Sequence, residues 1–238
     1  MNLGRITDDL VADLAGLTFG LPTAYVYNPL VYARPSWDLY CEKYGQGRPE
    51  ALLWGMNPGP FGMSQSGVPF GEVGHARDWL GLEAPVGKPT REHPKRPIEG
   101  FDCKRSEVSG ARLWGWAKDT YGTPEAFFAR FFVANYCPLV FMEESGRNRT
   151  PDKLPASERE PLFAACDRAM LRTIEHFQPR FVIGVGKFAE DRLRAVLAGT
   201  GRDVVIGRVP HPSPASPLAN GGWSDLMTKA LGDLGLSG

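Results

Sequence analysis

The hydrophobic positions of the chain form two kinds of pattern. Four short apolar runs are rich in β-branched and aromatic residues and are bounded by glycine or proline, which is typical of buried strands. These runs are residues 51–56, 131–136, 181–185 and 204–209.

Between these runs, apolar residues recur at helical spacing. One such helix reaches Phe177 before Pro179 ends it, and Ser157 with Glu160 predicts a capping box at its start. Further helices are predicted around Leu113, Trp116 and Ala117 up to Gly122, over residues 188–197 and over residues 223–234. Strands that alternate with helices predict an α/β sandwich with a mostly parallel sheet.

Length and composition favour one globular domain over residues 1–238, with 42% apolar and 23% charged residues. The 27 basic residues balance the 27 acidic ones, which counts against a nucleic-acid binder but leaves room for a local basic patch. The first residues lack the basic stretch of a signal peptide, and no apolar run is long enough to span a membrane. We therefore expect a soluble, intracellular protein.

Cysteine spacing excludes the usual metal motifs. Cys41, Cys103, Cys137 and Cys166 are far apart and form no CxxC pair or Cys/His cluster. Cys137 and Cys166 lie in apolar stretches and are predicted to be buried free thiols, as in a reducing compartment. No metal and no cofactor is expected.

The residues that follow the predicted strands suggest a site, because ligands of open parallel sheets bind at the carboxyl ends of the strands. Asn57 follows the first strand, Asn135 lies near the end of the second, Lys187 follows the third, and His211 follows the fourth. None of these ends carries a carboxylate.

This set of residues narrows the chemistry. Paired-carboxylate sugar hydrolysis, a serine nucleophile elbow and a P-loop each require residues that these strand ends lack. Two amides and an imidazole instead suit a planar heterocycle with carbonyl and N–H groups, because an amide can both donate and accept and an imidazole can stabilise a developing oxyanion.

Each candidate also has a simpler structural interpretation. Asn57 before Pro-Gly could form a turn, Asn135 could bond backbone groups, His211 could be part-buried without a role, and Phe70 could belong to the core. Glu72 is either an auxiliary base or a solvated loop acid. The basic segment 88–112 is either a solvated loop or a contact for a DNA backbone.

Several motifs together resemble one family. "GMNPGPFGM", "GVPFGEV", "ANYCPL", "SGRNRTP", "GVGK" and "HPSP…ANGGW" occur in this order and are similar to the single-strand-selective monofunctional uracil-DNA glycosylases. The resemblance implies the fold of the uracil-DNA glycosylase superfamily, a three-layer α/β/α sandwich around a four-stranded parallel sheet. It implies a base-excision repair hydrolase that flips uracil from single- or double-stranded DNA and leaves an abasic site without strand cleavage. We expect the protein to be a monomer.

The resemblance also implies residue roles. Asn57 positions the attacking water, His211 stabilises charge at O2 of the departing base, Asn135 reads the uracil edge, and Phe70 stacks on the base. The base pocket is expected to include Met56, Gly59, Pro60, Phe61, Gly62 and Met63. DNA contacts are expected from Lys187 and from the wedge loop, which comprises Pro212, Ser213, Pro214, Ala215, Ser216, Pro217 and Leu218.

The sequence departs from the family in the wedge loop, where Ala215 and Gly221 replace basic residues. This loss of charge makes activity on single strands a firmer expectation than activity on duplexes. A pocket with small Gly62 next to Met63 favours space for 5-substituted uracils such as 5-hydroxymethyluracil. The alternatives are a glycosylase for xanthine or hypoxanthine, a non-catalytic single-strand binder and a nucleoside hydrolase.

Overall fold

The computed structural model describes residues 2–236. The strands are β1 (Tyr25–Tyr27), β2 (Ala51–Gly55), β3 (Phe131–Asn135), β4 (Val140–Met142), β5 (Asn148–Arg149), β6 (Phe181–Val185) and β7 (Val205–Val209). The α-helices are α1 (Leu3–Ala15), α2 (Pro29–Tyr32), α3 (Arg34–Tyr44), α4 (Met63–Ser66), α5 (Val108–Tyr121), α6 (Pro124–Phe128), α7 (Ala156–Phe177), α8 (Lys187–Leu197) and α9 (Trp223–Asp233).

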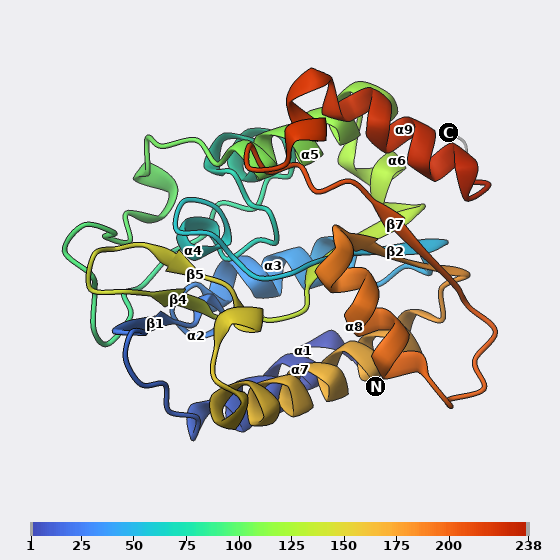
Figure 1. Ribbon diagram of the computed structural model, residues 1–238. Coiled ribbons are helices and arrows are strands. Elements are labelled where there is room, and N and C mark those ends of the chain that lie inside the picture. Colours follow the sequence, from blue (N-terminus) through green and yellow to red (C-terminus); the bar gives the residue numbers. More distant parts are fainter. Residues whose placement is uncertain (1, 237–238) are drawn as a thin grey trace.

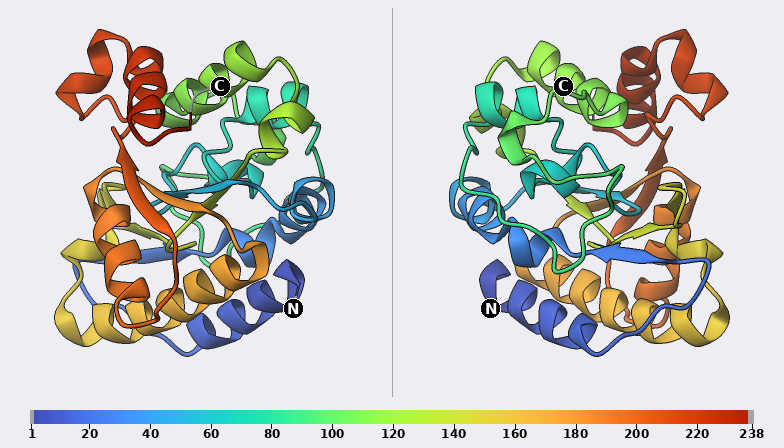
Figure 2. Two further views of the ribbon diagram at one scale, coloured as in Figure 1. Left: turned by 90° about the vertical axis from the view of Figure 1, so that its right-hand side faces the viewer. Right: turned by 90° about the vertical axis from the view of Figure 1, so that its left-hand side faces the viewer.

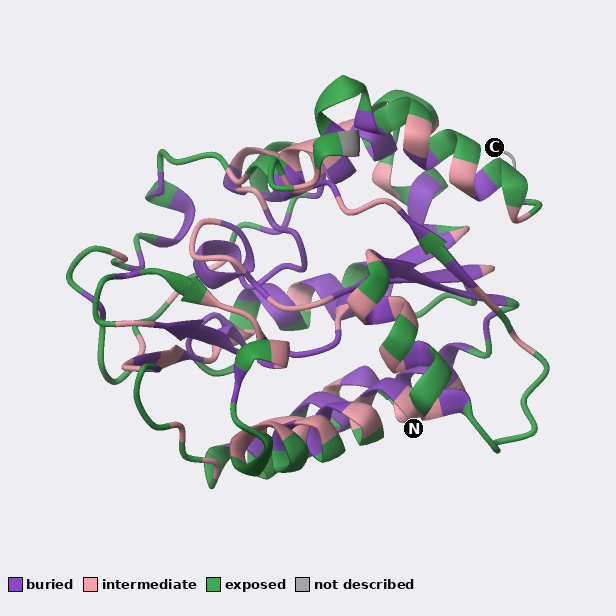
Figure 3. Cartoon of the chain, viewed as in Figure 1, coloured by how far each residue is buried: buried purple, intermediate pink, exposed green. Residues whose placement is uncertain are grey.

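The four predicted strands form one parallel sheet in the order β3-β2-β6-β7. Helices α1, α7 and α8 cover one side of the sheet, and α5, α6 and α9 cover the other (Figures 1 and 2). The predicted three-layer α/β/α architecture is therefore confirmed. The strands β2, β3 and β6 are buried along nearly their whole length, while the outward faces of the helices are exposed (Figure 3).

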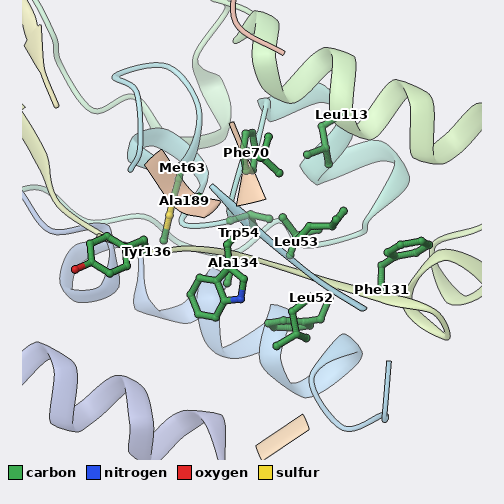
Figure 4. Packing of buried hydrophobic residues seen from close by; sticks show 14 of the residues in the cluster. Leu52, Leu53, Trp54, Met63, Phe70, Leu113, Phe131, Ala134, Tyr136 and Ala189 are labelled. Carbon is green, nitrogen blue, oxygen red and sulfur yellow. The ribbon is translucent and has the colours of Figure 1, made fainter. Parts of the chain in front are cut away.

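The core is built by alternation along the strands, whose successive side chains point to opposite faces. Leu52 and Leu53 of β2 lie on the two faces of the sheet, and Leu113 of α5 lies on the Leu53 side (Figure 4). Tyr40 of α3 reaches the sheet through its hydroxyl, which donates to the Val133 carbonyl at 2.8 Å. All four cysteines are buried free thiols, which confirms the prediction for Cys137 and Cys166.

The helix boundaries agree with the sequence pattern at α5, α8 and α9. The predicted capping box of α7 is wrong, because the helix begins at Ala156 after Pro155 and has no side-chain cap. Glu158, in the first turn of α7, instead accepts a hydrogen bond from the backbone N–H of distant Gly20 at 2.8 Å. The carboxylate of Glu158 at the start of α7 therefore binds a distant segment and does not form a local cap.

A second, antiparallel sheet in the order β1-β4-β5 lies beside the main one. Its strands have only two or three residues, too few for a periodic pattern in the sequence. The hairpin β4–β5 is nevertheless important for the site, because Asn148 of β5 and Thr150 directly after it line the cavity described below. No helix in the described part of the chain is long and apolar enough to cross a membrane.

Candidate active site

A cavity of about 470 Å³ opens at the carboxyl ends of the parallel strands. It contains the side chains from three of the four predicted strand ends, namely Asn57 after β2, Asn135 of β3 and His211 after β7. Its other lining residues are Met56, Pro58, Gly59, Gly62, Met63, Phe70, Glu107, Ser109, Asn148, Thr150, Ser213, Ala215 and Ser216. The convergence predicted from the strand ends is thus present in the structure.

His211 is held in one tautomer by its own loop. The backbone N–H of Ser213 donates to His211 Nδ1 at 3.0 Å, so the proton of a neutral ring resides on Nε2. Burial lowers the pKa of His211 from its ordinary value of 6.5. The imidazole is therefore a neutral N–H donor at physiological pH.

Asn57 is oriented by two backbone carbonyl groups. Its Nδ2 donates to Leu139 O at 3.1 Å and to Pro58 O at 3.3 Å. Within residues 2–236 no group donates to Asn57 Oδ1, so this oxygen is available as an acceptor. An amide oxygen in a fixed position can bind a water molecule, but it is too weak a base to deprotonate one.

The side chains of Asn135 and Phe70 both pack against the end of β2, because that strand ends in Gly55, which has no side chain. A Cβ atom at Gly55 would lie 2.3 Å from Asn135 Oδ1 and 2.6 Å from Phe70 Cε2. Asn135 Nδ2 is 3.4 Å from the sulfur of Met63, which places Met63 beside the amide. The glycine thus allows an amide and an aromatic ring to meet at one point of the cavity.

Phe70 adopts a backbone conformation that is unusual for a residue other than glycine, with φ of 52°. Its carbonyl oxygen accepts hydrogen bonds from Trp114 Nε1 at 3.1 Å and from Glu72 N at 2.7 Å. A Cβ at Gly110 of α5 would lie 1.9 Å from the same oxygen. The contact with α5 therefore fixes Phe70 beside the cavity. A strained backbone conformation of this kind is typical of functional positions.

Glu107 is one of the lining residues that strand-end reasoning missed, with Pro58, Ser109, Asn148 and Thr150. It is the N-cap of α5, where its carboxylate accepts from Ser109 N at 3.0 Å and from Gly110 N at 2.6 Å. It reaches the cavity next to Gly62. Its signal in the sequence is that of a helix cap, "SEVSGARLW", and nothing in this signal marks it as part of a site.

Glu72 is not brought to the cavity. It accepts hydrogen bonds from His75 N at 3.0 Å and from His75 Nδ1 at 2.8 Å. Although burial alone would raise the pKa of Glu72, the hydrogen bonds from His75 lower it below its ordinary value. The carboxylate therefore has a local structural role in its loop, and with its side chain only 13% exposed it is not the solvated acid that the simpler interpretation expected.

Three other expected residues also lie away from the cavity lining. The carbonyl of Pro60 accepts from Gln65 Nε2 at 3.1 Å. The Phe61 ring instead contacts Arg105, whose guanidinium carbon is 4.1 Å from the ring centroid. Lys187 is exposed at the start of α8 and is paired with Asp191.

The loop after His211 is anchored from the α5 side of the fold. Arg112 Nη1 donates to Pro212 O at 2.7 Å, and its Nη2 donates to Asn220 Oδ1 at 3.1 Å. Trp223 Nε1 donates to Pro210 O at 2.8 Å. Of the expected wedge residues, Ser213, Ala215 and Ser216 line the cavity, whereas Pro212, Pro214 and Pro217 do not. The Leu218 side chain is outside the described part of the structure.

The chain belongs to the uracil DNA glycosylase superfamily, whose family model matches residues 42–235. A crystal structure of Pedobacter heparinus SMUG2 has the same fold, with a TM-score of 0.63 at 18% identity and coverage of 97% of both chains.

Curated relatives narrow the assignment further. The chain is 49% identical over 227 residues to the single-strand selective monofunctional uracil DNA glycosylase of Mus musculus, over 95% of this chain and 81% of that protein. The same identity over 224 residues relates it to the protein of that name from Bos taurus. The chain is thus a member of the single-strand selective monofunctional uracil-DNA glycosylase family, as its motifs predicted.

Proposed function

We propose that this protein removes uracil from DNA by hydrolysing the N-glycosidic bond, and that it prefers single strands. The observation that carries the proposal is the meeting of Asn57, Asn135, Phe70 and a neutral His211 in one cavity. An enzyme of this kind must take the base out of the stack and hold it in a pocket. We place it as an intracellular monomer in base-excision repair.

The residues of the cavity support a role for each edge of the base. The base stacks on Phe70, whose ring centroid is 6.4 Å from that of His211. The Asn135 amide can pair with N3–H and O4 of uracil, and His211 Nε2–H can donate to O2. Asn57 Oδ1 holds the water that attacks C1′.

The reaction separates charge. The bond between C1′ and N1 breaks, its electron pair passes to the uracil ring, and the sugar becomes cationic until water adds to C1′ and loses a proton to solvent. A donor already placed at the developing oxyanion is typically worth about 3 kcal/mol. Because Asn57 cannot serve as a strong base, stabilisation of the leaving group dominates.

The product is expected to be an intact abasic strand. No lysine is among the residues that line the cavity in the described structure, and a Schiff-base step would need such an amine. The enzyme is therefore proposed to be monofunctional. We also propose that a 5-substituent such as hydroxymethyl is accepted beside Gly62 and Met63, both of which border the cavity.

The proposed function is tested with a labelled single-stranded oligonucleotide that carries one uracil, with alkali treatment after incubation. Cleavage at uracil only, and only after alkali, is the expected result; a thymine twin, a duplex and the free nucleoside serve as controls. Release from oligonucleotides that contain xanthine or hypoxanthine, without release of uracil, would instead favour the deaminated-purine alternative. Binding without any release would favour a single-strand binding module.

Substitution Gly55→Ala is expected to lower kcat/KM for uracil release by about two orders of magnitude. The new Cβ must displace Asn135 Oδ1 or the Phe70 ring, and a displacement of about 1 Å can cost roughly 10²-fold. Gly47→Ala is the matched control, since its Cβ would meet nothing within 4 Å. Thermal melting of both variants separates a displaced site from a failure to fold, and wild-type activity in Gly55→Ala would contradict the prediction.

A further inference from the structure

Residues 210–222 read PHPSPASPLANGG, so the loop that follows His211 contains no basic residue. The nearby Arg112 is used to hold this loop through Pro212 O and Asn220 Oδ1. DNA is a polyanion, and proteins that bind it neutralise several phosphates. Cations for a strand at this cavity must therefore come from another wall.

A cluster of basic residues lies on that other wall. Two loops form it, residues 88–106 and the β4–β5 hairpin with its flanks, residues 143–150 (left side of Figure 1). They are joined by hydrogen bonds from Arg96 Nε to Gly146 O at 3.2 Å and between His93 Nε2 and Glu144 O at 3.1 Å. We name as the basic rim the residues Lys95, Arg96, Lys104, Arg105 and Arg147.

The basic rim does not line the cavity itself but adjoins its lining residues at two points. Arg96 and Arg105 both contact the ring of Phe61, at 5.5 Å and 4.1 Å from its centroid, and Phe61 precedes the cavity residue Gly62. Arg147 directly precedes Asn148, which also lines the cavity. A strand whose base occupies the cavity would therefore pass the basic rim.

The five cations of the basic rim outnumber the three carboxylates of the same loops that form no ion pair within residues 2–236, namely Glu99, Asp102 and Glu144. Within residues 2–236, none of the five forms an ion pair with a carboxylate, whereas Glu92 and Glu143 of the same loops pair with Lys88 and Arg149. The shared contact with Phe61 places two guanidiniums within about one Debye length at 0.1 M salt, roughly 10 Å. Cations held so close repel each other until an anion lies between them.

We infer that the basic rim binds phosphates of the DNA strand that flank the flipped nucleotide. It supplies the positive charge that loop 210–222, on another wall of the cavity, lacks. This inference rests on the proposed function and adds a binding surface to it. Phe61 is then a positioning residue for two arginines, and stacking with the base is left to Phe70. On this inference, segment 88–112 contacts the DNA backbone through Lys95, Arg96, Lys104 and Arg105.

The first test measures equilibrium binding of a fluorescent thymine-only single strand over a series of NaCl concentrations. Each of Arg105→Gln and Arg147→Gln is expected to reduce the slope of log affinity against log salt by about 0.7, and thus to weaken binding about fourfold at 0.15 M salt. The double variant should show about twice the change in slope. Arg48→Gln is the matched control, because Arg48 lies before β2, at the end of the sheet away from the cavity, and among residues 2–236 it donates only to Gln178 Oε1.

The second test measures uracil release from a long single strand and from a trinucleotide with central uracil. For the long strand the two variants should raise KM by the same factor and leave kcat unchanged, and the trinucleotide, which keeps the two phosphates beside the flipped nucleotide, should show a rise in KM as well. Unchanged slopes, slopes shared with Arg48→Gln, or a loss in kcat alone would each overturn the inference. If the wild type released no uracil, the proposed function would fail, while the binding experiment would still decide the role of the basic rim.

Discussion

Replacing His211 with alanine is expected to lower kcat for uracil release by about two to three orders of magnitude. The substitution removes the Nε2–H donor that is fixed by the hydrogen bond from Ser213 N to His211 Nδ1. In a dissociative reaction this donor acts mainly in the transition state, so KM should change little. Single-turnover assays on a uracil-containing single strand measure the effect.

The pH dependence of the wild type provides an independent check on the same residue. Because burial lowers the pKa of His211 below 6.5, the neutral donor persists on acidification until the pH falls below that value. Protonation of Nδ1 then breaks the hydrogen bond from Ser213, and activity is lost. We expect a flat profile from pH 8 to below 6.5 and a decline only at lower pH. A decline that begins above pH 6.5 and is absent in His211→Ala would contradict the assignment of a neutral donor.

Replacing Asn57 with alanine is expected to lower single-turnover kcat by about two orders of magnitude, with KM nearly unchanged. The variant loses Oδ1, the acceptor that positions the attacking water, and misplacement of a reactant by about 1 Å can cost roughly 10²-fold. Full single-turnover activity in this variant would contradict the proposed role of Asn57.

A second substitution at this position distinguishes orientation from deprotonation. Asn57→Asp keeps an acceptor oxygen but replaces the Nδ2 donor with an oxygen that faces Leu139 O and Pro58 O. We expect its rate to lie between those of Asn57→Ala and the wild type. An Asn57→Asp enzyme faster than the wild type would show that a base is more useful here than an oriented amide.

The sequence predicted the part of the fold that depends on short-range pattern. Four apolar runs became the four parallel strands to within one residue, because their burial on both faces requires continuous hydrophobic stretches. The same logic placed Asn57, Asn135 and His211 at one edge of the sheet. The family motifs then supplied roles that no periodicity can supply.

The remaining features depend on contacts between distant segments. Strands of two or three residues, such as β5 (Asn148–Arg149), exist because a neighbouring strand pairs with them, and their own pattern is too short to show it. Phe61 sits in a motif shared with the base pocket, yet its ring contacts Arg96 and Arg105. The positive φ of Phe70 follows from the close approach of α5, which local sequence does not reveal.

The hydrogen bond from Ser213 N to His211 Nδ1 joins two tasks that enzymes often divide between separate segments. The loop that is proposed to meet the nucleic acid also sets the direction of the imidazole, since Ser213 and His211 lie within three positions of the chain. A strand that seats the loop poorly would leave the imidazole turned away from the base. If the loop contacts DNA as proposed, this single backbone N–H links substrate fit to bond cleavage, and a wrong fit would lower the rate even where the base itself is uracil.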